Sequence, residues 1–145
     1  MSEVAFHFNA PERVAYACRL LRKAYLKGAR VLVWIHEAEL PTLDTALWTF
    51  AQGEFVAHAR ARDPEPVRRH APILLTDDPD GVPFEADVLV NLAGSWTDGF
   101  TRFGRVIEVV TQDPQDRAGA RERWMRYRQQ GFEPLRHDLA LAPGT

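Results

Sequence analysis

Three short, mostly apolar runs constrain the fold of this chain more than any other feature of its sequence. They read RVLVWI, PILLT and DVLVNL, and they span residues 30–35, 72–76 and 87–92. A strand that is solvated on one face alternates between apolar and polar residues, whereas a strand that is covered on both faces is apolar almost throughout. The runs therefore predict buried strands of a mostly parallel sheet.

Helical patterns alternate with these strands. Apolar residues recur at helical spacing, and Pro or Gly residues mark the ends of the segments. Strands that alternate with helices are typical of a three-layer α/β/α fold. We expect residues 1–145 to form one such domain, Rossmann-like in its sheet. Further strands are expected at residues 4–8, 105–111 and 132–137, helices at 9–28, 41–52, 96–103 and 113–131, and an exposed loop at 59–71.

Composition and charge narrow the class of protein. The chain is 46% hydrophobic and 26% charged, with a formal net charge of −2. That charge argues against a basic body that binds nucleic acid directly. The single cysteine, Cys18, excludes an intramolecular disulfide and suits a reducing compartment. No signal peptide and no apolar run of membrane-spanning length is recognisable, so we expect a cytoplasmic protein with no membrane contact.

The common catalytic and cofactor-binding motifs are not found in the sequence. No Gly-x-x-x-x-Gly-Lys-Ser/Thr motif occurs, and the turn at residues 9–12 (NAPE) lacks the glycines that let a backbone wrap a pyrophosphate. The histidines are scattered without metal-ligand spacing, and no Gly-x-Ser-x-Gly elbow marks a nucleophile. We therefore predict no catalytic residues, no metal, no cofactor and no phosphate-binding loop.

The helix expected at residues 113–131 has unusually clear ends. Asp113 can cap it, because its carboxylate can accept hydrogen bonds from the first backbone N–H groups, and Pro114 follows at the first helical position. Asp116 lies in the first turn, where the helix dipole favours a negative charge. Gly131 is expected to end the helix in a left-handed conformation.

One face of this helix carries a basic and aromatic stripe. At about 100° per residue, the stripe contains Arg117, Arg121, Trp124 and Arg128. It is either a solvated helix face, with the indole under arginine stems, or a receptor for a ligand that is both anionic and apolar. Guanidinium groups bind carboxylates, including a chain-terminal one, and an indole can line an apolar pocket beside them. A short acidic peptide with an apolar last residue would match both features.

Several motifs occur in a distinctive order and spacing. Residues 43–48 read L-D-x-x-L-W, residues 55–58 read F-V-x-H, and residues 121–132 read R-E-R-x-x-x-Y-R-x-x-G-F. KGARV at residues 27–31 precedes these motifs, and DVLVNL at residues 87–92 lies between the second motif and the third. Together these motifs resemble the chi subunit family of bacterial DNA polymerase III, accessory proteins of the clamp-loader assembly.

The resemblance implies a non-catalytic bridging protein in DNA replication. One surface would bind the psi subunit of DNA polymerase III. A second surface would grip the acidic, phenylalanine-terminated C-terminal tail of single-stranded DNA-binding protein, so contact with nucleic acid would be indirect. As part of the replisome, such a protein would be nucleoid-associated.

The resemblance also implies site residues. Arg117, Arg121 and Arg128 would supply cations to the tail site, and Trp124 and Val110 would wall the pocket for the terminal phenylalanine. Met125 stands where the family can have a basic residue. Phe55 would anchor the psi surface. Trp48 is expected to contact a partner, without an indication of which one.

Two other classes compete with this interpretation. A degenerate nucleotide-binding or helicase-like domain would share the α/β pattern, although the missing phosphate loop argues against it. Direct binding of single-stranded DNA, by stacking on Trp124, would use the same stripe. The net charge of −2 and the lack of further exposed aromatic residues on that helix face argue against direct DNA binding.

Overall fold

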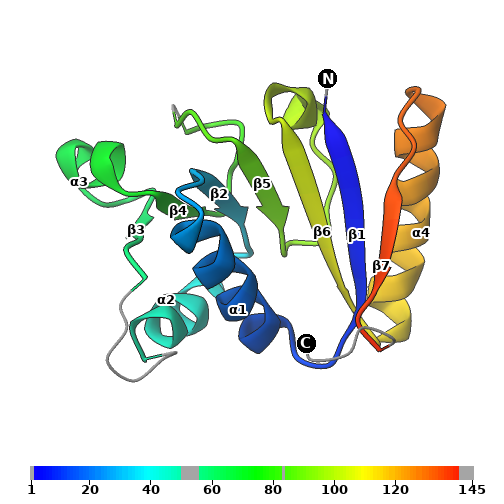
Figure 1. Ribbon diagram of the computed structural model, residues 1–145, viewed down its shortest axis with the longest axis horizontal. Coiled ribbons are helices and arrows are strands. Elements are labelled where there is room, and N and C mark those ends of the chain that lie inside the picture. Colours follow the sequence, from blue (N-terminus) through cyan, green and yellow to red (C-terminus); the bar gives the residue numbers. More distant parts are fainter. Residues whose placement is uncertain (1, 50–55, 83, 141–145) are drawn as a thin grey trace.

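A seven-stranded parallel sheet organises the chain in the computed structural model, which describes residues 2–49, 56–82 and 84–140 (Figure 1). Within these residues the strand order is β3-β4-β2-β5-β6-β1-β7, and every pair is parallel. The strands are β1 (Glu3–Ala10), β2 (Val31–Trp34), β3 (Ala59–Arg60), β4 (Ile73–Thr76), β5 (Val88–Asn91), β6 (Arg105–Thr111) and β7 (Leu135–Asp138). The helices are α1 (Arg13–Leu26), α2 (Leu40–Thr49), α3 (Glu65–His70) and α4 (Pro114–Gln129), with a 3₁₀ helix, η1 (Asp98–Arg102).

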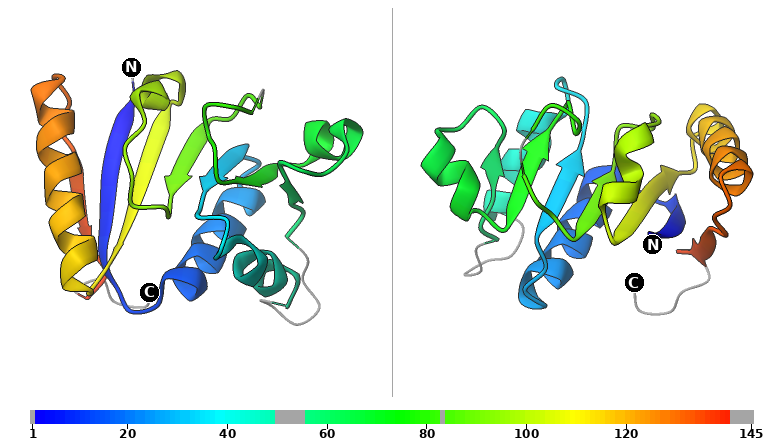
Figure 2. Two further views of the ribbon diagram at one scale, coloured as in Figure 1. Left: turned by 180° about the vertical axis from the view of Figure 1, so that it is seen from behind. Right: turned by 90° about the horizontal axis from the view of Figure 1, so that it is seen from above.

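The sheet is covered on both faces, which explains the apolar runs. Helices α1 and α2 pack on one face, while α4, η1 and the segment around Phe84 pack on the other (Figure 2). Strand β2 lies between the two layers, so Val31, Leu32 and Val33 are all fully buried. The prediction of buried parallel strands at β2, β4 and β5 is confirmed, and so is the α/β fold class.

Helix α4 begins and ends as predicted. The Asp113 side chain accepts a 3.0 Å hydrogen bond from the Gln115 N–H, and Pro114 is the first helical residue. After the last helical residue, Gly131 adopts a positive φ of 91°. A side chain at Gly131 would be strained in this conformation, so glycine is suited to the turn that leads into β7.

The prediction of an exposed loop at residues 59–71 is wrong. These residues contain β3, which pairs with β4, and the short helix α3. The two prolines do not prevent the helix, because Pro64 is its cap and Pro66 lies in its first turn, where a missing N–H is tolerated. The side chain of Arg60 is held by Asp44 of α2, a contact that the local sequence does not reveal.

Two smaller expectations are refined. The short helix expected at residues 96–103 is the 3₁₀ helix η1, and the last expected strand is β7, which pairs with β1. No helix among the described residues has the length and apolarity to cross a membrane.

Candidate functional site

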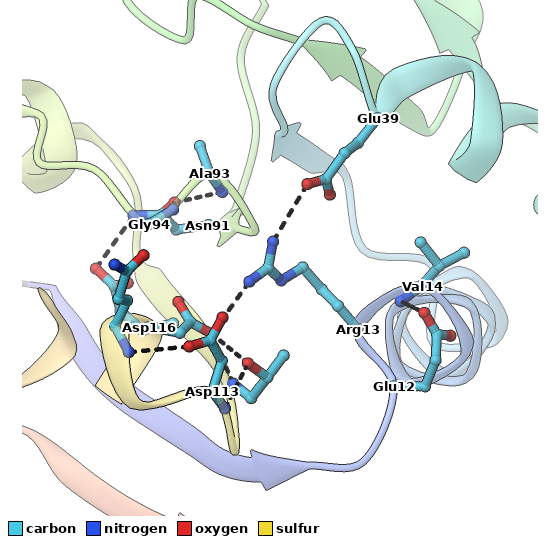
Figure 3. Close-up of polar contacts among 12 residues, drawn as sticks. Glu12, Arg13, Val14, Glu39, Asn91, Ala93, Gly94, Asp113 and Asp116 are labelled. Atoms are coloured by element: carbon cyan, nitrogen blue, oxygen red, sulfur yellow. Dashed lines mark hydrogen bonds and ion pairs between the residues drawn. The ribbon is translucent and has the colours of Figure 1, made fainter. Parts of the chain in front are cut away.

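The carboxyl edge of the sheet is the place where α/β folds commonly bind ligands. Here the chain's own side chains occupy it (Figure 3). Arg13, at the start of α1, pairs with Asp116 of α4 at 3.1 Å and with Glu39 at 3.5 Å. Glu12 caps α1 by accepting hydrogen bonds from the backbone of its first turn. A carboxylate at this helix N-terminus would repel a phosphate group, which disfavours nucleotide binding there.

Asp116 connects two elements at this edge. Its carboxylate accepts hydrogen bonds from the backbone N–H and the hydroxyl of Thr111, at 2.7 and 2.8 Å. Burial alone would raise the pKa of Asp116, but these hydrogen bonds and the Arg13 guanidinium lower the pKa below its usual value. The ionised carboxylate thus fixes the start of α4 against the end of β6 and against α1.

No potential metal site is found in the described part of the chain, since no three of its His, Cys, Asp and Glu side chains cluster suitably. The feature that most resembles a binding site lies elsewhere. It is a groove of about 500 Å³ between α4 and the strands β1, β6 and β7, which we call the α4 groove. Its floor contains Phe6, Phe8, Val110 and Ala120. Its rim contains Arg117, Arg121, Trp124 and Met125 on α4 and Arg136 on β7.

Trp124 forms an aromatic wall of the α4 groove. The indole is half-buried, and its ring centroid lies 5.1 Å from that of Phe6, which is itself buried. Val110, at the end of β6, lies beneath it in the floor. The structure thus brings together the apolar residues expected at the site, and it adds Phe6 and Phe8, which the sequence did not single out.

The predicted arginines separate into two groups. Arg117 and Arg121 are exposed and line the groove one helical turn apart. Arg128 is exposed on α4 but is not among the groove-lining residues. None of the three forms an ion pair with any residue that the structure describes, so their charges are available to a ligand.

A buried polar cluster holds α4 in the orientation that forms the groove. Arg123 donates to Glu108 of β6 at 3.0 Å and to the carbonyl of Gly94 at 2.8 Å. Tyr127 donates its hydroxyl to Glu108 at 2.8 Å, and Asn91 donates to the same carboxylate at 3.2 Å. Because Arg123 and Tyr127 point into the molecule, the basic stripe of α4 faces outward and toward β7.

The environment of this cluster shifts two pKa values. Burial raises the pKa of Glu108, and the Arg123 guanidinium acts against that rise. Burial and the Glu108 carboxylate raise the pKa of Tyr127, so its hydroxyl stays a hydrogen-bond donor. Arg123 belongs to the R-E-R motif, but the helical pattern alone did not reveal that it is buried.

Arg136 is the groove cation that sequence reasoning missed. It lies on β7, where its position pairs with Phe6 of β1, so both side chains are on the same face of the sheet. Its guanidinium carbon lies 4.9 Å from the centre of the Phe8 ring. From the sequence, the spacing of Phe6 and Phe8 by two residues along β1 could have predicted that both rings lie on one face of the sheet. No comparable pattern in the sequence predicts that β7 pairs with β1.

A second predicted surface lies around α2. Phe55 falls outside the described residues, so its assignment to the psi surface stays a prediction. Trp48 is 56% exposed, and its ring meets that of His58 edge-on at 5.4 Å. Asp44 accepts a 2.7 Å hydrogen bond from His58 and two hydrogen bonds from Arg60. Helices α2 and α4 lie toward opposite ends of the sheet (Figure 1).

The distinctive motifs now have a structural explanation. In L-D-x-x-L-W, Leu43 and Leu47 are buried under the sheet, while Asp44 binds the histidine of F-V-x-H. In R-E-R-x-x-x-Y-R, Arg123 and Tyr127 bind the buried Glu108. Both motifs therefore fix helices α2 and α4 to the sheet, and each leaves an exposed or half-buried tryptophan beside it.

Known proteins are similar to this sequence over most of its length. Residues 1–134 match the family described as "DNA polymerase III chi subunit, HolC". The chain is 34% identical over 131 residues to DNA polymerase III subunit chi of Pseudomonas aeruginosa, which covers 88% of this chain and 87% of that protein. It is 31% identical over 116 residues to DNA polymerase III subunit chi of Escherichia coli, which covers 79% of this chain and 78% of that protein. The chain therefore belongs to the DNA polymerase III chi subunit family, accessory subunits in DNA replication.

Proposed function

We propose that this protein is a non-catalytic bridging subunit of the replisome. Its α4 groove binds the acidic C-terminal tail of single-stranded DNA-binding protein, and a separate surface binds the psi subunit of the clamp loader. The binding of the tail is supported by the composition of the groove, in which unpaired guanidinium groups surround an apolar floor. The site of action is the cytoplasm, where the protein reaches DNA only through its partners.

A peptide that ends in an apolar residue matches the groove chemically. Its last side chain and its terminal carboxylate leave the same Cα atom, so an apolar floor must lie close to a cation. The half-buried Trp124, backed by the Phe6 ring, provides aromatic surface for a terminal phenylalanine, since aromatic rings favour tilted or edge-on contacts. A volume of about 500 Å³ is within the usual range of ligand sites and exceeds the space that one side chain needs.

The charged residues have distinct roles in this proposal. Arg117 and Arg121 bind the terminal carboxylate and a neighbouring acidic side chain, because they line the groove and have no partner among the described residues. Arg128 lies beyond Trp124 on the same helix and outside the groove. It attracts acidic residues that precede the peptide's end, in a more solvated contact.

Bridging requires two surfaces that can be occupied together. The surface around Trp48 is on α2, toward the end of the sheet that carries β4, and the α4 groove is toward the end that carries β7. In this proposal, a partner on one surface leaves the other surface free. We assign the psi subunit to the α2 surface, where Trp48 supplies exposed aromatic area and Phe55 is expected to contribute.

Calorimetric titration with a peptide that copies the acidic C-terminus of single-stranded DNA-binding protein tests the proposal. The matched control is the same peptide without its terminal phenylalanine. We expect micromolar binding that weakens as salt rises, because exposed charges are screened over about 10 Å at 0.1 M ionic strength. The control peptide should not bind measurably.

Other results would contradict the proposal in different ways. Equal binding of the control peptide would show a general charge patch and no pocket for the terminal residue. Tighter binding of a single-stranded oligonucleotide than of the peptide would favour direct DNA binding. No binding of the peptide at low salt would refute the tail site.

A further inference from the structure

We infer that Arg136 of β7 is a third ligand-binding cation of the α4 groove, placed on the wall opposite Arg117 and Arg121. This inference rests on the proposed function, because it concerns how the same groove holds an acidic tail. It adds a residue from outside the helical stripe, so it makes a distinct prediction about which side chains contribute to affinity.

The position of Arg136 follows from the register of β7. Its pairing with Phe6 places both residues on the face of the sheet that α4 covers. The Arg136 side chain lines the groove together with Phe6 and Phe8. The groove therefore has basic residues on two walls, one formed by a helix and one by an edge strand.

The Arg136 charge is available to a ligand. The side chain is exposed and forms no ion pair with any described residue. The nearest acidic residue on the same strand, Asp138, is bound to other groups: it accepts hydrogen bonds from the Asn9 side chain and from the Ala140 N–H. An acidic ligand does not have to displace an internal partner to reach Arg136.

The Phe8 ring orients the Arg136 guanidinium. A guanidinium that lies over an aromatic face keeps its N–H groups in the plane of the fork, where they can still donate to a carboxylate. Such stacking reduces the rotamer freedom that the side chain loses on binding. Arg136 is thus held in advance at the border between the apolar floor and the solvent.

The α4 wall has a gap in its charge that Arg136 can fill. Met125 lies one turn beyond Arg121, lines the groove and is 53% exposed, but it carries no charge. From this point on, the helix contributes no further cation to the groove, because Arg128 lies outside the lining. A second acidic group of the ligand can instead be bound from β7. Cations on both walls hold an extended peptide across the groove more firmly than cations on one wall.

Two substitutions separate charge from shape. Arg136→Met keeps a long unbranched stem over Phe8 but removes the charge, and Arg136→Lys keeps the charge. Arg126→Met is the control for removing a surface charge, because Arg126 is also exposed and stacked, over the Trp96 ring at 4.4 Å, but pairs with Asp98 at 3.8 Å and does not line the groove. Arg121→Met serves as the positive control within the groove. All four are titrated with the tail peptide at two salt concentrations, and thermal unfolding checks that each is folded.

We expect Arg136→Met to weaken peptide binding about tenfold, the lower end for a hydrogen-bonded charge, and to make the salt dependence shallower. Arg136→Lys should retain more of the affinity than Arg136→Met, because it keeps the charge but not the stacked fork, and Arg126→Met should bind like the unmodified protein. If Arg136→Met binds as tightly as the unmodified protein while Arg121→Met is weakened, this inference is wrong and the proposed function stands. If Arg136→Met and Arg136→Lys weaken binding equally, a positive charge alone does not explain the contribution of Arg136, and the inference of a charge contact is wrong. If the unmodified protein does not bind the peptide at all, the proposed function itself is wrong.

Discussion

Nε of Arg123 lies 3.0 Å from the carboxylate of Glu108, in a part of the interior that solvent does not reach. Arg123 is 5% exposed and Glu108 is fully buried. The pair connects α4 to β6, and Tyr127 and Asn91 complete the hydrogen bonds of the carboxylate. The orientation of the basic stripe therefore depends on two charges that lie beneath it.

Removing one partner of this pair should destabilise the fold. Glu108→Leu leaves the Arg123 guanidinium buried without a counter-charge, which should lower the free energy of unfolding by about 3–5 kcal/mol. The double variant Glu108→Leu/Arg123→Met should recover much of that loss, because neither charge is then buried. Urea denaturation measures both. Glu122→Gln, an exposed change on the same helix, is the control. A loss below about 1 kcal/mol in the single variant would contradict the prediction.

The arginines of α4 should differ in their contribution to tail binding. Arg121→Ala should weaken binding by about 1.5–3 kcal/mol, the range for hydrogen bonds to charged groups. Arg128→Ala should weaken it by only about 0.2–1 kcal/mol, because an exposed ion pair outside the groove is screened by water. Calorimetric titration with the tail peptide compares the two. A larger loss for Arg128→Ala would show that the peptide extends along α4 instead of entering the groove.

Asp44 should stabilise the α2 surface. Asp44→Ala removes the hydrogen-bond acceptor of both Arg60 and His58. Because the His58 side chain is only 1% exposed, water cannot readily replace the lost carboxylate. We expect a loss of about 1–3 kcal/mol in the free energy of unfolding. Glu37→Gln is the control, since Glu37 pairs with Arg62 at the surface. Equal stabilities of the two variants in urea would argue against a structural role for Asp44.

The stability should depend on pH through His7. Burial, followed by the positive charges of His137, Arg105 and Lys23, lowers the pKa of His7 from 6.5 to about 4. Between these values the unfolded chain binds a proton that the folded protein does not. The free energy of unfolding should therefore fall as pH decreases from 6.5 to about 4. Urea denaturation at several pH values in this window measures the slope.

Variants separate this effect from other titrations. His7→Gln should flatten the slope and can still hydrogen-bond to Tyr16, whereas His70→Gln, an exposed change, should leave the slope unaltered. The carboxyl groups of Asp44 and Asp116 have lowered pKa values, so their stabilisation is lost at more acidic pH, below about 3.9. An unchanged slope in His7→Gln would assign the pH dependence to another group.

Local signals in the sequence were sufficient for the main fold. The apolar runs predicted β2, β4 and β5, because covering a strand on both faces leaves few positions for polar side chains. The ends of α4 were predicted because caps act through neighbouring backbone groups. Strand β3 was missed because it depends on pairing with β4 and on Arg60 reaching Asp44, both of which are tertiary contacts.

The candidate site was predicted only in part, for a similar reason. Helical periodicity showed that Arg117, Arg121, Trp124 and Arg128 share one direction, but not where the groove ends along the helix. The groove ends before Arg128, and its opposite wall includes Arg136 from β7. The register between β1 and β7 determines that wall, and no spacing within either strand encodes it.

The place of β1 in the sheet has a consequence for synthesis. Its two neighbours, β6 and β7, both come much later in the chain, and paired residues such as Glu3 and Arg105 are 102 positions apart. At about 5–20 residues per second, a ribosome needs roughly 5–20 s to reach the first of these partners. During that time both edges of β1, and the aromatic side chains of Phe6 and Phe8, have no native neighbours. The groove that we assign to the tail is therefore among the last parts of the nascent protein to assemble.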